Sequence, residues 1–375
     1  MIVDSLGTGV FLRDYWQRRP VLLRQALPAF TDPISPEELA GLACETDVES
    51  RLVFSRSKTW RLKDGPFKTR DFTSLPKRNW TLLVQAVDQW VPAVRQLLET
   101  VSFLPSWRVD DVMISYAAPN GGVGPHFDYY DVFLVQGQGS RVWKTGQRAT
   151  TADTLRTDGG LKLLKRFQTE HEWRLERGDV LYVPPGIAHW GVSVDNSLCY
   201  SIGFRAPSLA DAVRGYADEL ARTLSPDQRV VDPKRRLPLR SGEIDAADLK
   251  QLKHQLRLVL HDDGALARWF GRHVTETVHA DIIQSGHSRV SANAMVQLHP
   301  SSRLAWIQQQ RQVFVFIDGE QHVLPGSAAV LESLQALSRG EAVTWRSLGV
   351  NSACRQWSRM LLRAGKLRRR TISTR

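Results

Sequence analysis

The residues best suited to chemistry are His126 and Asp128, two positions apart in the aromatic segment PHFDYYD at residues 125–131. This segment is rich in β-forming residues, and on a strand positions i and i+2 point to the same face. A buried carboxylate beside an imidazole is costly unless another group compensates for it. A divalent metal ion does so, because it accepts both a neutral imidazole nitrogen and a carboxylate oxygen. We therefore interpret the pair as two ligands of a metal site.

Two protein ligands make a weak site, so a third is expected elsewhere, and His189 in GDVLYVPPGIAHWGV is the best candidate. There a β-rich run ends in a Pro-Pro-Gly turn, and the next strand begins by presenting the histidine. Two histidines and one carboxylate leave the opposite coordination positions open, as in non-haem Fe(II) oxygenases. The alternatives are a hydrogen-bonded core histidine at 189 and an HxD pair that binds no metal.

Arg141 lies fifteen residues after His126, on the predicted strand SRVWKTG. We expect this strand to pair back along HFDYYDVFLVQ after the turn QGQGS. An arginine that points into a barrel needs an anionic partner, and its own strand offers no carboxylate. A dicarboxylate co-substrate that chelates the metal at one end and reaches Arg141 at the other would supply it. An outward-facing Arg141 is the alternative.

The composition is that of a soluble globular protein, with 375 residues, 42% hydrophobic and 24% charged. Since no apolar run approaches the roughly 20 residues that span a bilayer, we expect no membrane segment. The first residues lack a basic leader and a clean apolar core, which argues against a secretory signal. The three cysteines, Cys44, Cys199 and Cys354, are isolated, and this fits a reducing cytoplasm.

The elements that would position these side chains change in type along the chain. Residues 1–100 predict helices and short strands, with a capping box at Ser35 and Glu38 and one or two helices over residues 79–101. From about residue 107 the hydrophobic period becomes two, which favours a β-sandwich or barrel. Helical patterns return after Pro207, and the last segment mixes short strands with helices, as a winged-helix-like module does. The predicted domains are 1–207, 208–285 and 286–375.

Positive charge is concentrated at the end of the chain. Of the net charge of +11, +8 lies in residues 281–375, which hold 13 Lys/Arg and 5 Asp/Glu. Eight basic residues and no acidic one follow from Arg355 onward. Such a segment attracts polyanions such as nucleic acid or ribonucleoprotein. A solvated, partly disordered terminus is the equally weighted alternative.

Several stretches resemble the cupin-type (JmjC-domain) 2-oxoglutarate oxygenases, and more narrowly the bacterial ribosomal oxygenases, which hydroxylate an arginine of the sixteenth large-subunit ribosomal protein. The resemblance covers about residues 10–208 and becomes one of architecture after that. The stretches that carry it are FLRDYWQRRPVLLRQAL, PISPEELAGLACE, DDVMISYAAPNGGVGPHFD, HFDYYDVFLVQGQGSRVWKTG, GDVLYVPPGIAHWGVS and YSIGFRAPS. It implies an α+β protein with a double-stranded β-helix core, helical N-terminal elements, a helical dimerisation region and a winged-helix-like C-terminal domain.

Position by position, the resemblance implies Fe(II) ligands at His126, Asp128 and His189. It implies that Arg141 binds the distal carboxylate of 2-oxoglutarate and that Ser115, facing inward, contacts the co-substrate or substrate. No catalytic residue beyond the metal ligands is implied. Cys199 stands where close relatives are expected to carry an amide, and a thiol there is open to oxidation.

The implied activity couples decarboxylation of 2-oxoglutarate to hydroxylation of a ribosomal protein, in a homodimer. The cysteine pattern favours the cytoplasm, and the charge of the C-terminal region predicts contact with ribosomal RNA. A nucleic-acid-binding regulator with a non-catalytic cupin, a JmjC-type demethylase and a cupin isomerase stay open as alternatives. Three further features lie close to these residues in the sequence or on the next predicted strand. Tyr130 lines the substrate mouth or packs in the core, Asp131 offers a carboxylate to a cationic target, and EHE at 170–172 forms a second metal site or a polar loop.

Overall fold

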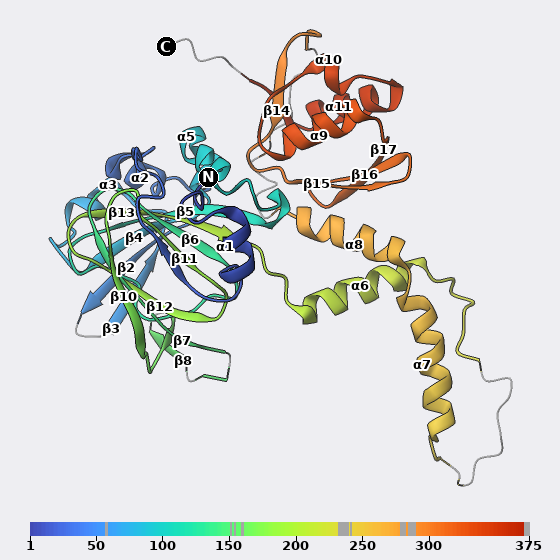
Figure 1. Ribbon diagram of the computed structural model, residues 1–375, viewed down its shortest axis with the longest axis horizontal. Helices are drawn as coiled ribbons and strands as arrows, with labels where there is room; N and C mark the ends of the chain where they lie inside the picture. Colours follow the sequence, from blue (N-terminus) through green and yellow to red (C-terminus); the bar gives the residue numbers. More distant parts are fainter. Residues whose placement is uncertain are drawn as a thin grey trace. The chain divides into compact units, whose positions relative to one another are not determined.

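The chain folds into two compact units, Met1–Ala206 and Pro207–Arg375 (Figure 1). The computed structural model describes residues 1–56, 59–150, 152–153, 155–158, 161–231, 240, 242–277, 283 and 290–370. No helix in these ranges is long and apolar enough to cross a lipid bilayer. The finer division into 1–207, 208–285 and 286–375 stays a prediction.

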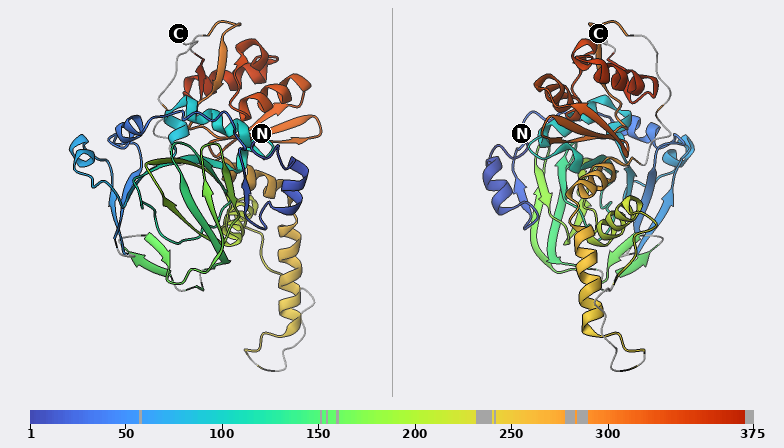
Figure 2. Two further views of the ribbon diagram at one scale, coloured as in Figure 1. Left: turned by 60° about the vertical axis from the view of Figure 1, so that its left-hand side comes forward. Right: turned by 90° about the vertical axis from the view of Figure 1, so that its right-hand side faces the viewer.

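The N-terminal unit is built on two antiparallel sheets that face each other (Figure 2). The larger has the order β1-β11-β6-β13-β5-β4-β2-β3 and the smaller the order β10-β7-β12. The strands of the larger sheet are β1 (Val21–Leu23), β2 (Ser50–Arg56), β3 (Thr59–Asp64), β4 (Trp80–Val84), β5 (Val109–Ala117), β6 (Val132–Gln136), β11 (Val180–Val183) and β13 (Ser197–Phe204). Those of the smaller are β7 (Arg141–Arg148), β10 (Thr169–Leu175) and β12 (Ile187–Ser193), and a hairpin adds β8 (Leu155–Asp158) and β9 (Leu161–Leu164). The expected α+β class with a double-stranded β-helix core is confirmed.

The strands β6, β11 and β13 are buried along their whole length because both of their faces are covered. One face packs against the N-terminal elements in a cluster that includes Phe11, Phe133 and Tyr182. The opposite face meets the smaller sheet, where Leu134 and Cys199 share a cluster with side chains of that sheet. Residues that alternate along these strands therefore divide between an outer core and the barrel interior.

Short helices cover the outer face of the larger sheet. They are α1 (Thr8–Asp14), α2 (Pro36–Leu42), α3 (Thr69–Thr73), α4 (Val87–Trp90) and α5 (Pro92–Arg95), followed by the 3₁₀ helices η1 (Gln96–Val101) and η2 (Ser106–Arg108). The predicted capping box is confirmed, since the Ser35 hydroxyl accepts from the Glu38 amide and the Glu38 carboxylate accepts from the Ser35 amide.

Two predictions about strands were wrong. Helix was expected from residue 79, but Trp80–Val84 form β4, paired between β2 and β5, and helix begins only at Val87. Strand β7 was expected to pair along residues 126–136, but it pairs with β10 and β12 in the other sheet. The turn after β6 therefore carries the chain from one sheet to the other instead of closing a hairpin.

The C-terminal unit begins with the helices α6 (Leu209–Thr223), α7 (Ala246–Leu260) and α8 (Asp263–Thr275). Helices α6 and α8 are joined by the buried carboxylate of Glu219, which pairs with Arg268 and Arg272. The rest is a small mixed module of β14 (Met295–Leu298), β15 (Leu304–Gln309), β16 (Gln312–Ile317), β17 (Glu320–Pro325), α9 (Ala328–Ser338), β18 (Val343–Thr344), α10 (Trp345–Leu348), α11 (Ser352–Arg363) and β19 (Leu367–Arg369). The prediction of helices followed by a winged-helix-like end is confirmed.

Candidate metal and co-substrate site

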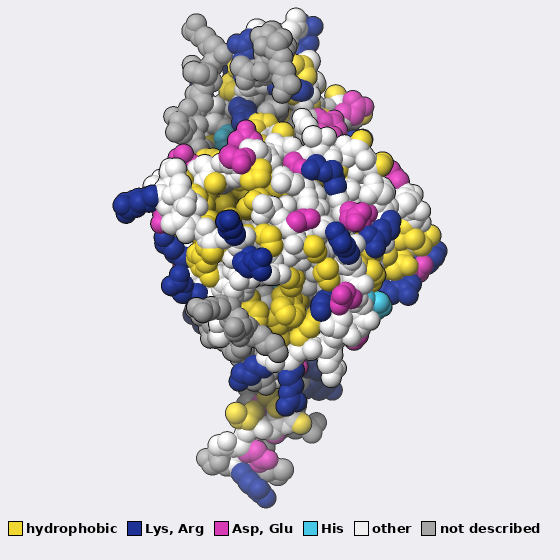
Figure 3. All heavy atoms as spheres, turned by 90° about the vertical axis from the view of Figure 1, so that its left-hand side faces the viewer, with side chains coloured by type: hydrophobic (Ala, Val, Ile, Leu, Met, Phe, Trp, Pro, Cys, Tyr) yellow, Lys and Arg dark blue, Asp and Glu magenta, His cyan; other side chains and the backbone are white. Residues whose placement is uncertain are grey.

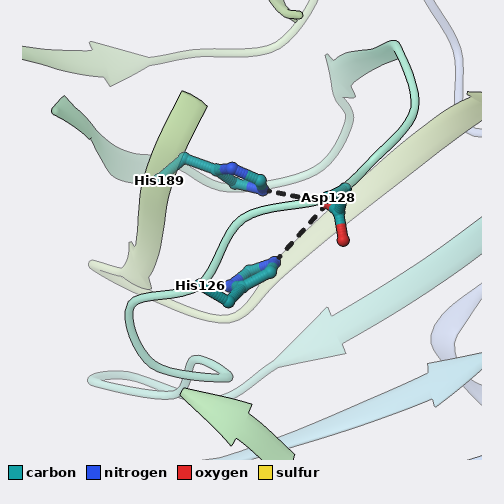
Figure 4. Close-up of side chains that lie close together, drawn as sticks. All are labelled: His126, Asp128 and His189. Atoms are coloured by element: carbon teal, nitrogen blue, oxygen red, sulfur yellow. Dashed lines mark ion pairs between the residues drawn. The ribbon is translucent and has the colours of Figure 1, made fainter. Parts of the chain in front are cut away.

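The structure brings His126, Asp128 and His189 together at one end of β12 (Figure 4). Potential ligand atoms of the three lie within 4.8 Å of one another, the only such group among the described residues. Nε2 of His189 is 3.4 Å from Oδ2 of Asp128, and Nε2 of His126 is 3.9 Å from the same oxygen. Both imidazoles point toward the carboxylate from separate segments of the chain.

The backbone around His126 has a different conformation from the predicted strand. The segment around His126 and Asp128 is not a regular strand, and His126 forms an isolated bridge with His189 in which each amide donates to the other's carbonyl. The amide of Gly186 donates to the Asp128 carbonyl at 2.7 Å and holds the following loop. The premise of a shared strand face was therefore wrong, although the side chains that it paired do lie together.

Hydrogen bonds define which ring nitrogens are free. Nδ1 of His126 lies 2.9 Å from the Gly124 carbonyl, and Nδ1 of His189 lies 3.0 Å from the Ile187 carbonyl. Because a carbonyl only accepts, each Nδ1 carries the proton in the neutral ring and each Nε2 keeps its lone pair. Burial, followed by the neighbouring imidazole, lowers the pKa of His189 to about 4, so this ring is neutral at pH 7.

These donors fit a divalent cation. Two ligand atoms bound at about 2.1 Å to one ion lie at most about 4.2 Å apart. The distances from Oδ2 of Asp128 to Nε2 of His126 and to Nε2 of His189 both fall within that limit. Two imidazoles and one carboxylate are the donor set of non-haem Fe(II) sites, in which the remaining positions take other ligands.

Arg141 lies at the start of β7 with its guanidinium inside the barrel, 5% exposed. Its Nε donates to the Ser197 hydroxyl at 2.8 Å and its Nη1 donates to the Ser115 hydroxyl at 2.7 Å. Its Nη2 donates to the carbonyls of the same two residues at 2.9 and 3.0 Å. Four hydrogen bonds to residues of β5 and β13 therefore orient the guanidinium, which excludes the alternative that Arg141 faces outward.

This guanidinium has hydrogen-bond acceptors but no counter-ion. Among the described residues no Asp or Glu forms an ion pair with Arg141, and burial lowers the pKa of the guanidinium from its usual value. An arginine stays protonated even so, and a buried charge without a partner is costly. The arrangement therefore fits an anion that binds beside Arg141.

Two further polar atoms on the same face of β7 have no partner. Alternation along the strand puts Trp143 and Thr145 on the side of Arg141, and Thr145 is the cross-strand neighbour of His189. Within the described structure, the buried Trp143 Nε1 and Thr145 Oγ1 make no hydrogen bond. Buried groups of this kind are rare unless something unseen satisfies them. Four residues of β7, or roughly 13 Å of extended strand, therefore separate Arg141 from Thr145, the neighbour of His189.

Sequence reasoning did not single out Trp143 and Thr145. The signal was available, because positions i+2 and i+4 from an inward-facing Arg141 must share its face. What could not be known was that these two polar atoms would lack partners.

Other expectations near the site have mixed outcomes. Ser115 is buried and touches Arg141, and Cys199 is its cross-strand neighbour inside the barrel. Tyr130 is 43% exposed, so it is not a core residue, and burial of its hydroxyl together with the neighbouring Asp128 carboxylate raises its pKa. The expectation for Asp131 was wrong, because its buried carboxylate accepts from Tyr182 and Gln17 and is not available to a target.

The EHE cluster is neither a metal site nor a loop. It lies on β10 with exposed side chains, where His171 stacks on Trp173 and Glu172 pairs with Lys144 at 3.2 Å. Packing and ion pairing therefore account for these residues.

Comparison with known proteins agrees with this architecture. Residues 96–212 match the JmjC domain family, and residues 257–364 match the ROXA-like winged helix family. The fold and the site thus define a JmjC-domain oxygenase.

Relatives narrow the class further. The chain is 38% identical over 283 residues to the ribosomal protein uL16 3-hydroxylase of Escherichia coli, and the match covers 73% of each protein. It is also 38% identical over 214 residues to a probable ribosomal oxygenase of Haemophilus influenzae, with 56% of this chain and 53% of that one covered. The crystal structure of YcfD from E. coli superposes with a TM-score of 0.86 at 31% identity, and the match covers 98% of this chain and 99% of that one. The structure of YcfD in complex with cobalt and 2-oxoglutarate superposes with a TM-score of 0.85 at the same identity and coverage. The chain belongs to the bacterial ribosomal oxygenases.

Proposed function

We propose that this protein hydroxylates an arginine side chain of the large-subunit ribosomal protein uL16, with Fe(II) as its metal and 2-oxoglutarate as its co-substrate. In the balanced reaction, 2-oxoglutarate, O2 and a C–H bond give succinate, CO2 and C–OH. The observation that carries the proposal is the buried, uncompensated guanidinium of Arg141 on the same barrel face as the His126–Asp128–His189 cluster. The relative named for uL16 3-hydroxylation supports the choice of substrate.

His126, Asp128 and His189 would hold the metal, which when bound supplies the means to activate O2. The protein contributes geometry. The backbone carbonyls of Gly124 and Ile187 hold the two imidazoles with Nε2 toward the metal. Arg141, oriented by Ser115, binds the far carboxylate of the co-substrate, and Thr145 offers a hydroxyl between the two ends.

The test is to incubate the purified chain with Fe(II), 2-oxoglutarate and a uL16 peptide, and to measure succinate and peptide mass. We expect succinate formation that depends on iron and is raised by the peptide, with a gain of about 16 Da on an unmethylated arginine. A loss of about 14 Da from a methylated peptide would indicate a demethylase instead. Absence of 2-oxoglutarate turnover would favour a regulator with a non-catalytic cupin or an isomerase.

The protein is further proposed to act as a homodimer. Leu249, Leu252, Leu256 and Val259 follow a 3-4-3 spacing along α7, and no residue of this helix is buried. An apolar stripe of this kind fits a second copy of the chain. Light scattering should give a dimer for the wild type and a monomer for a Leu252→Asp, Leu256→Asp variant. A wild-type monomer would remove this part of the proposal.

We also place the protein in the cytoplasm, in contact with ribosomal RNA through its basic C-terminal region. The ribosomal substrate and the net charge of +8 over residues 281–375 support this placement.

A further inference from the structure

Two helices near the end of the chain form a helix-turn-helix. Helix α10 ends at Leu348, three residues including Gly349 make the turn, and α11 begins at Ser352. The Asn351 side chain caps α11 by accepting from the Cys354 amide at 2.9 Å. Strands β18 and β19 flank β14 in a small sheet beside the two helices. In nucleic-acid-binding proteins of this design, the second helix presents its exposed face to the ligand.

Helix α11 has two sharply different faces. One face is buried in the core of the module, with Trp357, Leu361 and Leu362 among its members. The other face carries Arg355, Arg359 and Arg363, all exposed and spaced four residues apart. Since the helix rises 1.5 Å per residue, each step advances about 6 Å, and the three guanidinium groups form one row. From Arg355 to Arg370 the terminus is folded and includes α11 and β19, so a disordered tail does not describe this range, and residues 371–375 lie outside the described residues.

No acidic residue neutralises this row. The sequence contains no Asp or Glu after Glu341. Ion pairs of the module lie elsewhere, for example between Arg339 and Glu341 and between Lys366 and Asp318. Within the described residues, the three arginines form no ion pair. Like charges at this spacing weaken a helix unless an anion lies against them. By contrast, the face of the molecule in Figure 3 carries acidic side chains between its Lys and Arg.

We propose that the row Arg355–Arg359–Arg363 binds the phosphate backbone of double-stranded RNA. Arginine matches phosphate in a bidentate way, and a row of arginines about 6 Å apart along the helix axis can follow successive phosphates. A protein partner fits less well, because the exposed face has no aromatic anchor and only Met360 as a large apolar side chain. The choice of RNA over DNA rests on the proposed ribosomal substrate. Contacts to phosphates make the binding sensitive to salt and insensitive to base sequence.

The experiment measures binding of a labelled RNA hairpin to the full chain by fluorescence anisotropy at several salt concentrations. The test variant is R355Q/R359Q/R363Q, since glutamine is a good helix former and these positions are exposed. The plot of log affinity against log salt should become shallower by about 2–3, since each phosphate contact contributes about 0.9. At 0.1 M salt the same loss corresponds to a weakening on the order of a hundredfold.

The matched control is R70Q/K77Q/R78Q, which removes the same charge from exposed positions of the N-terminal unit. It should leave the salt slope within about 1 of the wild-type value. The variant R355K/R359K/R363K should keep most of the slope, because it keeps the charge. Equal binding by the glutamine variant and the wild type would overturn the proposal, as would equal losses in test and control variants or tighter binding of polyglutamate than of RNA.

Hydroxylation of a short uL16 peptide separates this inference from the proposed function and also reports folding. The glutamine variant should modify the peptide at the wild-type rate while RNA binding falls. Peptide turnover without RNA binding by the wild type would refute only the RNA contact, and RNA binding without turnover would refute only the hydroxylase.

Discussion

The replacement Arg141→Met tests whether the buried guanidinium is the anchor for the far carboxylate of 2-oxoglutarate. Methionine keeps an unbranched apolar stem but removes the charge and all four hydrogen bonds to Ser115 and Ser197. Removing one partner of a desolvated charge pair costs about 2–5 kcal/mol. At 1.4 kcal/mol per factor of ten, the apparent KM for 2-oxoglutarate should rise by roughly 30-fold to 4,000-fold. Arg141→Lys keeps a positive charge without the planar guanidinium, so its apparent KM for 2-oxoglutarate should lie between those of the wild type and Arg141→Met.

Thermal unfolding offers a second readout that needs no turnover. With Co(II) in place of iron, and 2-oxoglutarate at 100 times its wild-type Kd, the ligand should stabilise the wild type by about 2.7 kcal/mol. If the Kd rises by about 30-fold or more, the same concentration stabilises Arg141→Met by less than about 0.9 kcal/mol. Stabilisation by the metal alone should persist, because His126, Asp128 and His189 are untouched.

The control is Arg174→Met, the same chemical change on the neighbouring strand β10, where the side chain is 57% exposed. It should leave the KM for 2-oxoglutarate unchanged. A KM for Arg141→Met within about threefold of the wild-type value would refute the reasoning, because a loss of that size is below the smallest expected cost of removing the charged partner.

Three further changes follow from the same geometry. Thr145→Val removes the unpaired hydroxyl at nearly constant volume, and we expect the KM for 2-oxoglutarate to rise by about 5-fold to 10-fold with unchanged thermal stability. An unchanged KM would show that the hydroxyl does not touch the co-substrate. In metal-free protein, burial lowers the pKa of His189 to about 4, so the unfolded state takes up a proton that the folded state excludes. The neutral, buried imidazole should therefore contribute about 3 kcal/mol to the free energy of unfolding above about pH 6.5, and this contribution should be lost as the pH falls toward 4. In His189→Asn, the free energy of unfolding measured with urea should change less over that pH range. Gly191→Ala would place a methyl group 2.8 Å from the Trp143 indole, which should lower the free energy of unfolding by about 1–3 kcal/mol, while Gly41→Ala, with open space around it, should not lower it. Equal melting temperatures for the Gly191→Ala variant and the wild type would contradict the tight packing beside His189.

The grouping of the site residues was predictable because one metal and one diacid explain several polar side chains together, and because the motifs resemble those of known oxygenases. A histidine and a carboxylate in an aromatic segment, a second histidine after a Pro-Pro-Gly turn, and an arginine without an acid all called for a metal and a diacid. The local conformation was less predictable. The bridge between His126 and His189 replaces the expected strand, and no pattern in PHFDYYD distinguishes a strand from a loop held beside one.

The first error in the predicted fold arose because short apolar runs carry little information on hydrophobic period. Trp80–Val84 precede a true helical stretch, so the whole run was interpreted as helix, although pairing with β2 and β5 makes this part a strand. The partner of β7 depends on contacts between distant segments, which alternation along one strand does not reveal. At the C-terminus, net charge left a polyanion-binding segment and a solvated tail equally weighted, whereas the spacing of Trp357, Leu361 and Leu362 belongs to an amphipathic helix.

The most direct test of the account is an anaerobic titration of the metal-free protein with Co(II), followed by visible absorption before and after 2-oxoglutarate is added. We predict one tightly bound ion per chain, a further spectral change at one equivalent of 2-oxoglutarate, and loss of both in His126→Ala. Binding that survives the loss of His126, or a spectrum that 2-oxoglutarate does not alter, would contradict the claim that these side chains hold a metal to which the co-substrate binds.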